Sequence, residues 1–268
     1  YNDEIKIKEG IIMELHNPTK RVIDILNIIS KNSDKLTFSN ISKSLEIPKS
    51  TLSPILKTLV ELEVLNLEPI SQTYATGLGA FQIGQSYLKN LNGLDIIKSH
   101  MTTITNSCNE TCQLGINHNN EVLYLTKVEC SQPIKLMSSI GRNLPLYCTG
   151  LGRALLFNYS EKEIRNLYSN GLTQFTEKTV SNVDDLIKII NFSKKEGFAE
   201  EKAEVTIDAC CVAVPLVVNN QIQAAIGISL PMSRATENHL LNIISLLKLH
   251  SQLISEELEA LNIKSILV

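Results

Sequence analysis

The chain has 268 residues, of which 43% are hydrophobic and 20% are charged, and its formal net charge at pH 7 is −3. This composition is ordinary for a folded globular protein of one or two domains. The charge balance excludes a broadly basic surface that would coat nucleic acid, but it allows a small local basic patch.

Cysteine usage and hydropathy indicate where the protein resides. The six cysteines lack the dense spacing of a disulfide-stapled secreted domain, and no charged-then-apolar signal segment precedes them. No apolar run reaches the roughly 18 residues that a membrane-spanning helix needs. We therefore expect free thiols, no membrane partner and a cytoplasmic location.

Three short helices are predicted near the N-terminus. The first covers about residues 18–31, and the second covers "SNISKSLE", with Thr37 or Ser39 as its N-cap and Glu46 as its end. Apolar residues at helical spacing mark the buried face of the third, namely Leu52, Ile55, Leu56, Leu59 and Leu62. The tight turn between the second and third helices is typical of a helix-turn-helix.

The third helix poses a problem, because "IPKSTLSPILKTL" places Pro54 inside it. An interior proline lacks the N–H for the i−4 carbonyl and costs about 3 kcal/mol. In the first turn the N–H has no helical partner, so a proline there is tolerated. We therefore expect the helix to begin at Thr51 or Ser53, with "PKS" as a separate turn.

A small hairpin follows the helices. "EVLNLE" and "QTYATG" alternate enough to form strands and are joined by the turn-prone "PIS". This order of elements predicts a winged helix-turn-helix over residues 1–85. A plain three-helix bundle with a capping hairpin has the same spacing and stays open as an alternative.

The remainder of the chain predicts a linker and a second domain of class α+β. Leu94, Ile97, Met101 and Ile104 mark one face of a linker helix within 86–106, which we expect to transmit a signal between domains. Residues 107–268 then predict strands at "QLGINH", "EVLYLTKVE" and "IKLMSSI", followed by three helices over about 150–197. A hairpin turning at Asn219-Asn220 and a long helix over 236–261 complete this mixed domain.

Five segments in register resemble one known family. They are "KRVIDILNIIS", "LTFSNISKSLEIPKST", the stretch from "GINHNNEVLYL" to "LYCTGLGRALL", "KKEGFAEEKAEV" and "CCVAVPLVVNNQIQAAIGISLPMSR". Together they resemble an IclR-type transcriptional regulator, over most of residues 18–258. The resemblance implies a winged helix-turn-helix that dimerises on a double-stranded DNA operator. It also implies a GAF-like effector domain, assembly into dimers or dimers of dimers, and no cofactor.

The resemblance points to the third helix as the DNA reader. Side chains near the N-terminus of such a helix contact base edges and phosphates, and the candidates here are Lys49, Ser50, Thr51, Ser53 and Lys57. Ser and Thr serve equally well as helix caps, so the residue types alone do not settle this role. Glu46 stands where the family commonly has Gly in the turn, and Pro54 where it often has a polar residue.

The resemblance also implies an effector pocket in the second domain, and "CTGLG" at the start of a helix offers free backbone N–H groups to a small carboxylate. The same glycines also fit a tight packing turn. Gly227 stands where members often carry a hydroxyl. The implied pocket residues are Leu136, Leu144, Gly150, Leu151, Glu201, Cys211 and Ser229.

Two other classes of function remain as alternatives. A metal- or thiol-responsive regulator could use Cys148, Cys210 or Cys211 with His118, although no CxxC pair is present. An enzyme is disfavoured because the sequence has no nucleophile elbow, HExxH or phosphate-loop motif. We therefore expect a regulator rather than a catalyst.

Overall fold

The computed structural model describes residues 6–8, 11–13, 15–32, 35–136 and 139–266. The chain divides into two compact units, Tyr1–Lys89 and Asn90–Val268, which we call unit 1 and unit 2. In the described residues no helix combines the length and apolar character that crossing a membrane requires.

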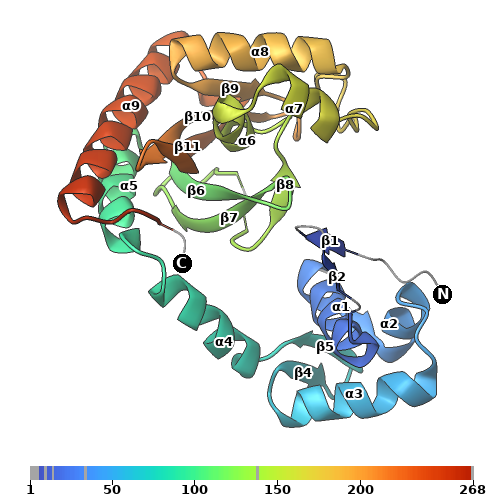
Figure 1. Cartoon of the computed structure of the whole chain (residues 1–268). Helices are drawn as coiled ribbons and strands as arrows, with labels where there is room; N and C mark the ends of the chain where they lie inside the picture. Colours follow the sequence, from blue (N-terminus) through green and yellow to red (C-terminus); the bar gives the residue numbers. More distant parts are fainter. Residues whose placement is uncertain (1–5, 9–10, 14, 33–34, 137–138, 267–268) are drawn as a thin grey trace. The chain divides into compact units, whose positions relative to one another are not determined.

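Unit 1 is a helix-turn-helix followed by a wing (Figure 1). A capping box between Thr37 and Asn40 starts the second helix, as its sequence predicts. The core is built of isoleucine and leucine side chains from the three helices and the wing. The elements are β1 (Lys6–Lys8), β2 (Ile11–Met13), α1 (Asn17–Lys31), β3 (Leu36–Thr37), α2 (Phe38–Ser44), α3 (Lys49–Glu61), β4 (Leu65–Glu68), β5 (Thr73–Thr76) and α4 (Leu78–Lys89).

The predicted late start of the third helix is wrong. Helix α3 begins at Lys49 with Pro48 as its N-cap, so Thr51 lies within the first turn and Pro54 is the sixth residue, inside the helix. Pro54 has no N–H to offer the carbonyl of Ser50. Burial of Leu52, Leu56 and Leu59 against the core of unit 1 offsets that loss.

The turn between α2 and α3 is strained at Glu46. Its φ of 52° lies in the left-handed region, where a residue with a Cβ costs on the order of 1 kcal/mol relative to glycine. The Ser42 hydroxyl donates a hydrogen bond of 2.8 Å to the carbonyl of Ile47, and the Ile47 N–H returns one of 3.1 Å to the Ser42 carbonyl. These two bonds hold the turn closed despite the strain.

The expected single linker helix over 86–106 is instead two helices. Helix α4 ends at Lys89, and α5 (Leu94–Cys108) begins after Gly93, whose φ of 73° breaks the helical path. Ile97, Met101 and Ile104 are buried inside unit 2, where α5 packs against the last helix. The apolar stripe read from the sequence is therefore a core face of unit 2.

Unit 2 is built on an antiparallel sheet with strand order β8-β7-β6-β11-β10-β9. Helices α6 to α8 cover one face, and α5 and α9 pack together on the other (Figure 1). Its elements after α5 are β6 (Thr111–His118), β7 (Glu121–Val128), β8 (Asn143–Pro145), α6 (Gly150–Leu155), η1 (Leu156–Asn158), α7 (Glu161–Leu167), α8 (Val183–Glu196), β9 (Ala199–Lys202), β10 (Ala209–Val218), β11 (Gln221–Pro231), η2 (Met232–Arg234) and α9 (Glu237–Ala260).

The hairpins of unit 2 follow their predicted turns. Asn119-Asn120 and Asn219-Asn220 all have positive φ, as the two-residue turns of twisted hairpins require. The strand expected at 134–140 is wrong, because the residues described there are not in a strand and the next one is β8. Strand β9, which forms one edge of the sheet, was not predicted.

Candidate functional site

Strand register in unit 2 brings three of the predicted pocket residues side by side. Cys211 on β10 lies directly opposite Ser229 on β11 and directly opposite Glu201 on β9. Directly opposed residues on neighbouring strands project from the same face of a sheet. Glu201, Cys211 and Ser229 therefore form a polar row across three strands, although 28 positions separate the first from the last.

A cavity of about 270 Å³ lies over this row. Five of the seven predicted pocket residues line it, namely Leu136, Leu144, Glu201, Cys211 and Ser229. Its other walls come from β6, β7, the turn before β8 and the segment after β9. These additional lining residues are Gln113, Tyr124, Ser139, Arg142, Thr149, Val205, Thr206, Ala209 and Cys210.

Gly150 and Leu151 are near the cavity but do not line it. A Cβ at Gly150 would lie 2.9 Å from the Cys211 sulfur, so the start of α6 sits directly behind that side chain. Burial raises the pKa of Cys211 to about 12, and the Glu201 carboxyl acts in the same direction, whereas the nearby Ser229 hydroxyl and the N–H groups of Leu151 and Gly150 oppose it. The helix N–H groups that the sequence offers to a carboxylate therefore face the Cys211 sulfur.

The glycine at position 227 reflects a lack of space. A Cβ there would lie 2.8 Å from the Cβ of Ala213 and 3.2 Å from the Leu151 side chain. The hydroxyl that family members often carry at this position has no room here. Polar contacts to a ligand must therefore come from other residues of the cavity.

Glu201 is the buried acid of the cavity. Its side chain is nearly inaccessible to solvent and accepts a hydrogen bond of 2.7 Å from the backbone N–H of Glu204. Burial raises its pKa to about 7, with the neighbouring Glu204 contributing in the same direction and Arg153 opposing it. Burial therefore favours the protonated form of Glu201 more strongly than it would for an exposed carboxyl.

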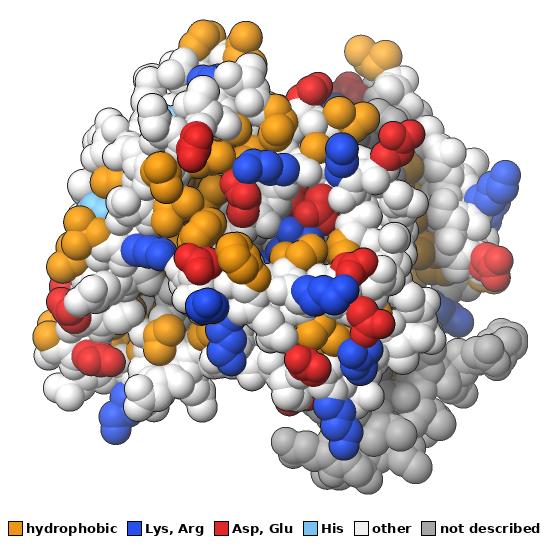
Figure 2. Space-filling model, turned by 90° about the horizontal axis from the view of Figure 1, so that it is seen from above, with side chains coloured by type: hydrophobic (Ala, Val, Ile, Leu, Met, Phe, Trp, Pro, Cys, Tyr) orange, Lys and Arg blue, Asp and Glu red, His pale blue; other side chains and the backbone are white. Residues whose placement is uncertain are grey.

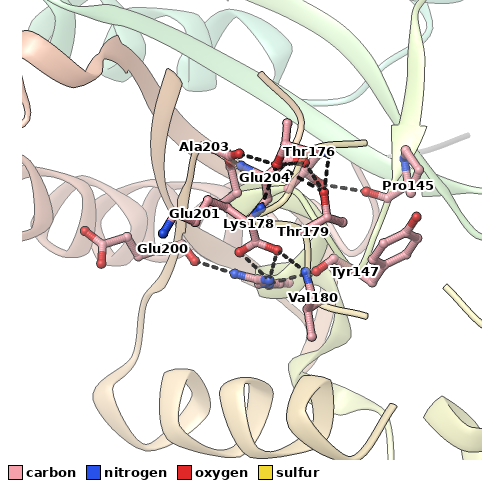
Figure 3. Close-up of polar contacts among 12 residues, drawn as sticks. Pro145, Tyr147, Thr176, Lys178, Thr179, Val180, Glu200, Glu201, Ala203 and Glu204 are labelled. Carbon is pink, nitrogen blue, oxygen red and sulfur yellow. Dashed lines mark hydrogen bonds and ion pairs between the residues drawn. The ribbon is translucent and has the colours of Figure 1, made fainter. Parts of the chain in front are cut away.

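A buried ion pair anchors the segment that carries Glu201. The Arg153 guanidinium on α6 lies 2.7 Å from the Glu204 carboxylate and also donates to the backbone carbonyls of Tyr147 and Glu200. Figure 3 shows the hydroxyls of Thr176 and Thr179 directed at the backbone of the same segment. They donate hydrogen bonds of 2.6 Å to the carbonyls of Ala203 and Glu204, respectively.

Sequence reasoning missed this network and part of the cavity. Arg153 and Glu204 are 51 positions apart, and nothing in either local pattern indicates that they meet. Tyr124 and Arg142 were also missed, although Arg142 stands in the quoted stretch "GRNLPLY" as its only cation. A cation beside an otherwise apolar segment is the one signal that could have marked it.

Positive, negative and hydrophobic side chains are mixed on the surface shown in Figure 2. In the space-filling view the face is hollowed near its centre, and lysine or arginine, acidic and hydrophobic side chains alternate around the hollow (Figure 2). This pattern has no broad positive area on the side shown.

The alternative metal site has no ligand set in the described residues, where no group of three His, Cys, Asp or Glu side chains could hold a metal ion. The cysteines are free and buried. Burial raises the pKa of Cys148 and of Cys210 to about 12, and metals bind the thiolate rather than the thiol. His118 lies at the end of β6 and contacts Asn119.

In unit 1 the predicted DNA-reading residues all lie on α3. Lys49, Ser50 and Lys57 are exposed, while Thr51 and Ser53 are partly buried. Ser50 and Lys57 are seven positions apart and therefore lie on one helical face, with the exposed Pro54 between them. Helix α3 therefore exposes two lysines and one hydroxyl, and two further hydroxyls are partly buried.

Fold and cavity together define a winged-helix protein with a separate ligand-binding unit. The family model of the IclR helix-turn-helix domain matches residues 18–69, and the model described as "Bacterial transcriptional regulator IclR C-terminal" matches residues 85–256. The chain belongs to the IclR family of bacterial transcriptional regulators.

Individual relatives agree with this family. The HTH-type transcriptional repressor AllR of Escherichia coli K12 is 29% identical over 221 residues, which cover 82% of each chain. The structure of the Thermotoga maritima IclR is 27% identical with a TM-score of 0.72, over 90% of this chain and 98% of that one. An IclR homologue from Microbacterium hydrocarbonoxydans, solved with 4-hydroxybenzoate, shares the fold with a TM-score of 0.76 at 20% identity, over 91% and 99% of the two chains.

Proposed function

We propose that this protein is a cytoplasmic repressor that binds a DNA operator through unit 1 and releases it when a small organic acid occupies the cavity of unit 2. The observation that carries the proposal is the polar row of Glu201, Cys211 and Ser229 lining a cavity, in the same chain as a winged helix-turn-helix. Repression is the action named for the relative AllR.

The DNA-contacting surface we propose is the exposed face of α3. Lys49, Ser50, Thr51 and Ser53 lie in its first turns, where such helices contact base edges, and Lys57 lies one turn further for a phosphate. Residues 1–80 hold nine Lys and Arg against ten Asp and Glu. One head therefore neutralises few phosphates, and we expect useful affinity only when two heads bind one palindrome.

Self-association of unit 1 is proposed through α4. Ile83 and Tyr87, one turn apart on the same side of this helix, expose 68% and 45% of their surface. Large apolar side chains clustered on an exposed face commonly mark an interface. A second copy of this chain is the occupant we propose, because two heads are needed for a palindrome. Assembly of two such dimers would make a dimer of dimers.

An organic acid is the ligand class that the cavity favours. Leu136, Leu144 and Val205 supply apolar walls, and a limited set of polar groups supplies orientation. The ligand named for the Microbacterium hydrocarbonoxydans homologue, 4-hydroxybenzoate, is an acid of this kind.

The test begins by selecting duplexes from a random DNA pool with the full chain. We expect a palindrome, and we expect at least one acid from a panel of small carboxylates to lower the affinity for it. Ile83→Asp should lower affinity for the palindrome at least tenfold without unfolding unit 1, whereas Gln82→Asp, which adds the same charge at an exposed polar position, should not. Selection of no duplex, or an affinity that no acid changes, would contradict the proposal.

A further inference from the structure

Two polar side chains in the cavity have no partner in the described residues. The hydroxyl of Tyr124, a residue with only 8% of its surface exposed, makes no hydrogen bond to any described group. The exposed guanidinium of Arg142 forms no ion pair with any carboxylate that the structure describes. The sequence resemblance gave neither residue a role.

The backbone fixes these two residues beside each other. The Tyr124 N–H donates to the Arg142 carbonyl at 3.1 Å, and the Gly141 N–H donates to the Tyr124 carbonyl at 2.8 Å. A turn closed by the Arg142 N–H on the carbonyl of Ser139, at 3.2 Å, contains Gly141 with φ of 81°. Arg142 is therefore held at the edge of β7 by main-chain bonds rather than by its own side chain.

The Tyr124 hydroxyl lies between two ends of the cavity, which we call its poles. One pole carries Glu201, Cys211 and Ser229, and the other carries Arg142. Burial raises the pKa of Tyr124, and the charges of Cys211 and Glu201 raise it further, while the Arg142 guanidinium opposes them. Tyr124 thus lies within reach of the acidic row on one side and of the one cation that lines the cavity in the described residues on the other.

The pole that carries Glu201 and Ser229 offers hydrogen-bonding groups but no positively charged side chain among the described residues. The Ser229 hydroxyl donates to the Gln113 side-chain oxygen at 3.1 Å, which leaves the Gln113 amide N–H groups for the cavity. The Glu201 carboxyl accepts hydrogen bonds from the backbone N–H groups of Glu204 and Val205, and it also lines the cavity. A carboxylate placed here would meet the partial negative charge of Glu201, whereas an uncharged hydroxyl or amide would not.

We propose that Arg142 and Tyr124 bind the carboxylate of the effector, and that Gln113, Ser229 and Glu201 bind an uncharged polar group at its other end. This inference rests on the proposed function, because it requires that the cavity take an organic acid. A guanidinium presents parallel N–H groups that match both carboxylate oxygens. The N–H groups of Gly150 and Leu151, which already face the Cys211 sulfur, are not needed for this purpose.

The size of the cavity limits the effector further. A cavity of about 270 Å³ is at the small end of the range for ligand pockets, about 300–1,000 Å³, so it favours a small effector. The effector class is therefore a small monocarboxylate with a hydroxyl or amide group at its far end, on an apolar middle that contacts Leu136 and Leu144.

The experiment uses the full chain, a panel of small hydroxy- and amido-monocarboxylates with 4-hydroxybenzoate among them, and the matched primary carboxamide of each acid. Thermal shift identifies acids that bind, and calorimetry measures their dissociation constants. We expect acids to bind at least tenfold more tightly than their carboxamides. Arg142→Gln should remove that preference, and Tyr124→Phe should weaken acid binding several-fold.

The control variant is Arg165→Gln, which removes an exposed arginine paired with Asp184 on the helices outside the cavity. It should bind every acid like the wild type. If Arg142→Gln keeps the acid preference while Ser229→Ala weakens binding, the carboxylate lies at the other pole, so this inference fails and the proposed function stands. If no acid in the panel binds the wild-type chain, the organic-acid effector and this inference both fail.

Discussion

Different kinds of buried side chains stabilise the interiors of the two units. Of the buried polar or charged side chains that the structure describes, Thr73 alone belongs to unit 1, whose core is isoleucine and leucine. Unit 2 buries Glu201, which lines its cavity, the Arg153–Glu204 pair, and Glu110, which pairs with Arg234. A unit that reads DNA through its surface needs only a rigid core, whereas a unit that encloses a ligand must bury polar groups with it.

This difference has an energetic consequence. An apolar core tolerates the loss of any single surface charge, because exposed ion pairs contribute only about 0 to 1 kcal/mol. A buried polar network depends on each member, because removal of one leaves another desolvated and without a partner. Removing one charged partner of an ion pair should therefore lower the stability of unit 2 much more than that of unit 1.

The largest expected effect is on the Arg153–Glu204 pair. Its side chains are 2% and 10% exposed, so Arg153→Met should lower the free energy of unfolding of unit 2 by about 3–5 kcal/mol. Lys20→Met, which removes one partner of an exposed pair in unit 1, should cost less than about 1 kcal/mol. Hydrogen exchange on peptides from each unit of the full chain measures both effects.

A second substitution shows whether the unpaired charge is the cause. Adding Glu204→Gln to Arg153→Met removes the stranded carboxylate but keeps an acceptor for the N–H of Val180. Part of the lost stability should return. If the double variant is less stable than Arg153→Met alone, packing around Arg153 rather than its charge holds this segment.

The next effect depends on pH and involves Glu201. Burial raises its pKa from 4.5 to about 7, so the folded chain holds a proton that the unfolded chain releases between these values. Stability is therefore lost as pH rises through that window, by up to about 3 kcal/mol at 1.4 kcal/mol per pKa unit. Glu201→Gln should match the wild type near pH 4.5 and exceed it by up to that amount at pH 8.

Chemical denaturation of unit 2 at about pH 4, 6 and 8 tests this expectation, because the outer values lie below and above the two pKa values of Glu201. Glu200→Gln on the same strand controls for the general effect of removing a carboxylate there. A Glu201→Gln variant that is less stable than the wild type at pH 8 would mean that the ionised carboxylate stabilises the fold, contrary to the burial argument.

Local patterns in the sequence were sufficient for most elements of both units. Helices α1, α2, α8 and α9 and the hairpins at Asn119-Asn120 and Asn219-Asn220 follow from periodicity, caps and turn residues, which act over a few positions. The apolar stripe on α5 was assigned to a linker helix because such a stripe fits a linker as well as a core helix, and only packing against α9 distinguishes the two.

The cavity could be predicted only in part, for the same physical reason. The family resemblance supplied Glu201, Cys211 and Ser229, and the strand register brings them together. The partners that position them were missed because they are distant in the chain: Ser229 and Gln113 are 116 positions apart. Contacts made by tertiary packing leave no periodic signal in a single sequence.

The smallest expected effect concerns Pro54, the proline inside helix α3 of unit 1. Because Pro54 is exposed and interior to α3, a residue with an N–H at this position restores the hydrogen bond to the Ser50 carbonyl without disturbing packing. Pro54→Ala and Pro54→Arg should both raise the free energy of unfolding of unit 1, by about 1–3 kcal/mol. Only arginine also adds a charge to the face that carries Ser50 and Lys57.

Titration with the selected palindrome at several salt concentrations separates backbone repair from charge. Pro54→Arg should bind more tightly than Pro54→Ala and increase the salt slope by about 1 for each added phosphate contact. Equal affinity of the two variants would mean that position 54 does not face DNA. If neither variant is stabilised, the missing Pro54 N–H costs the wild-type helix little, and the exposed Ser50 carbonyl is satisfied by water instead. In that case any gain in DNA affinity of Pro54→Arg over Pro54→Ala would come from the added charge alone.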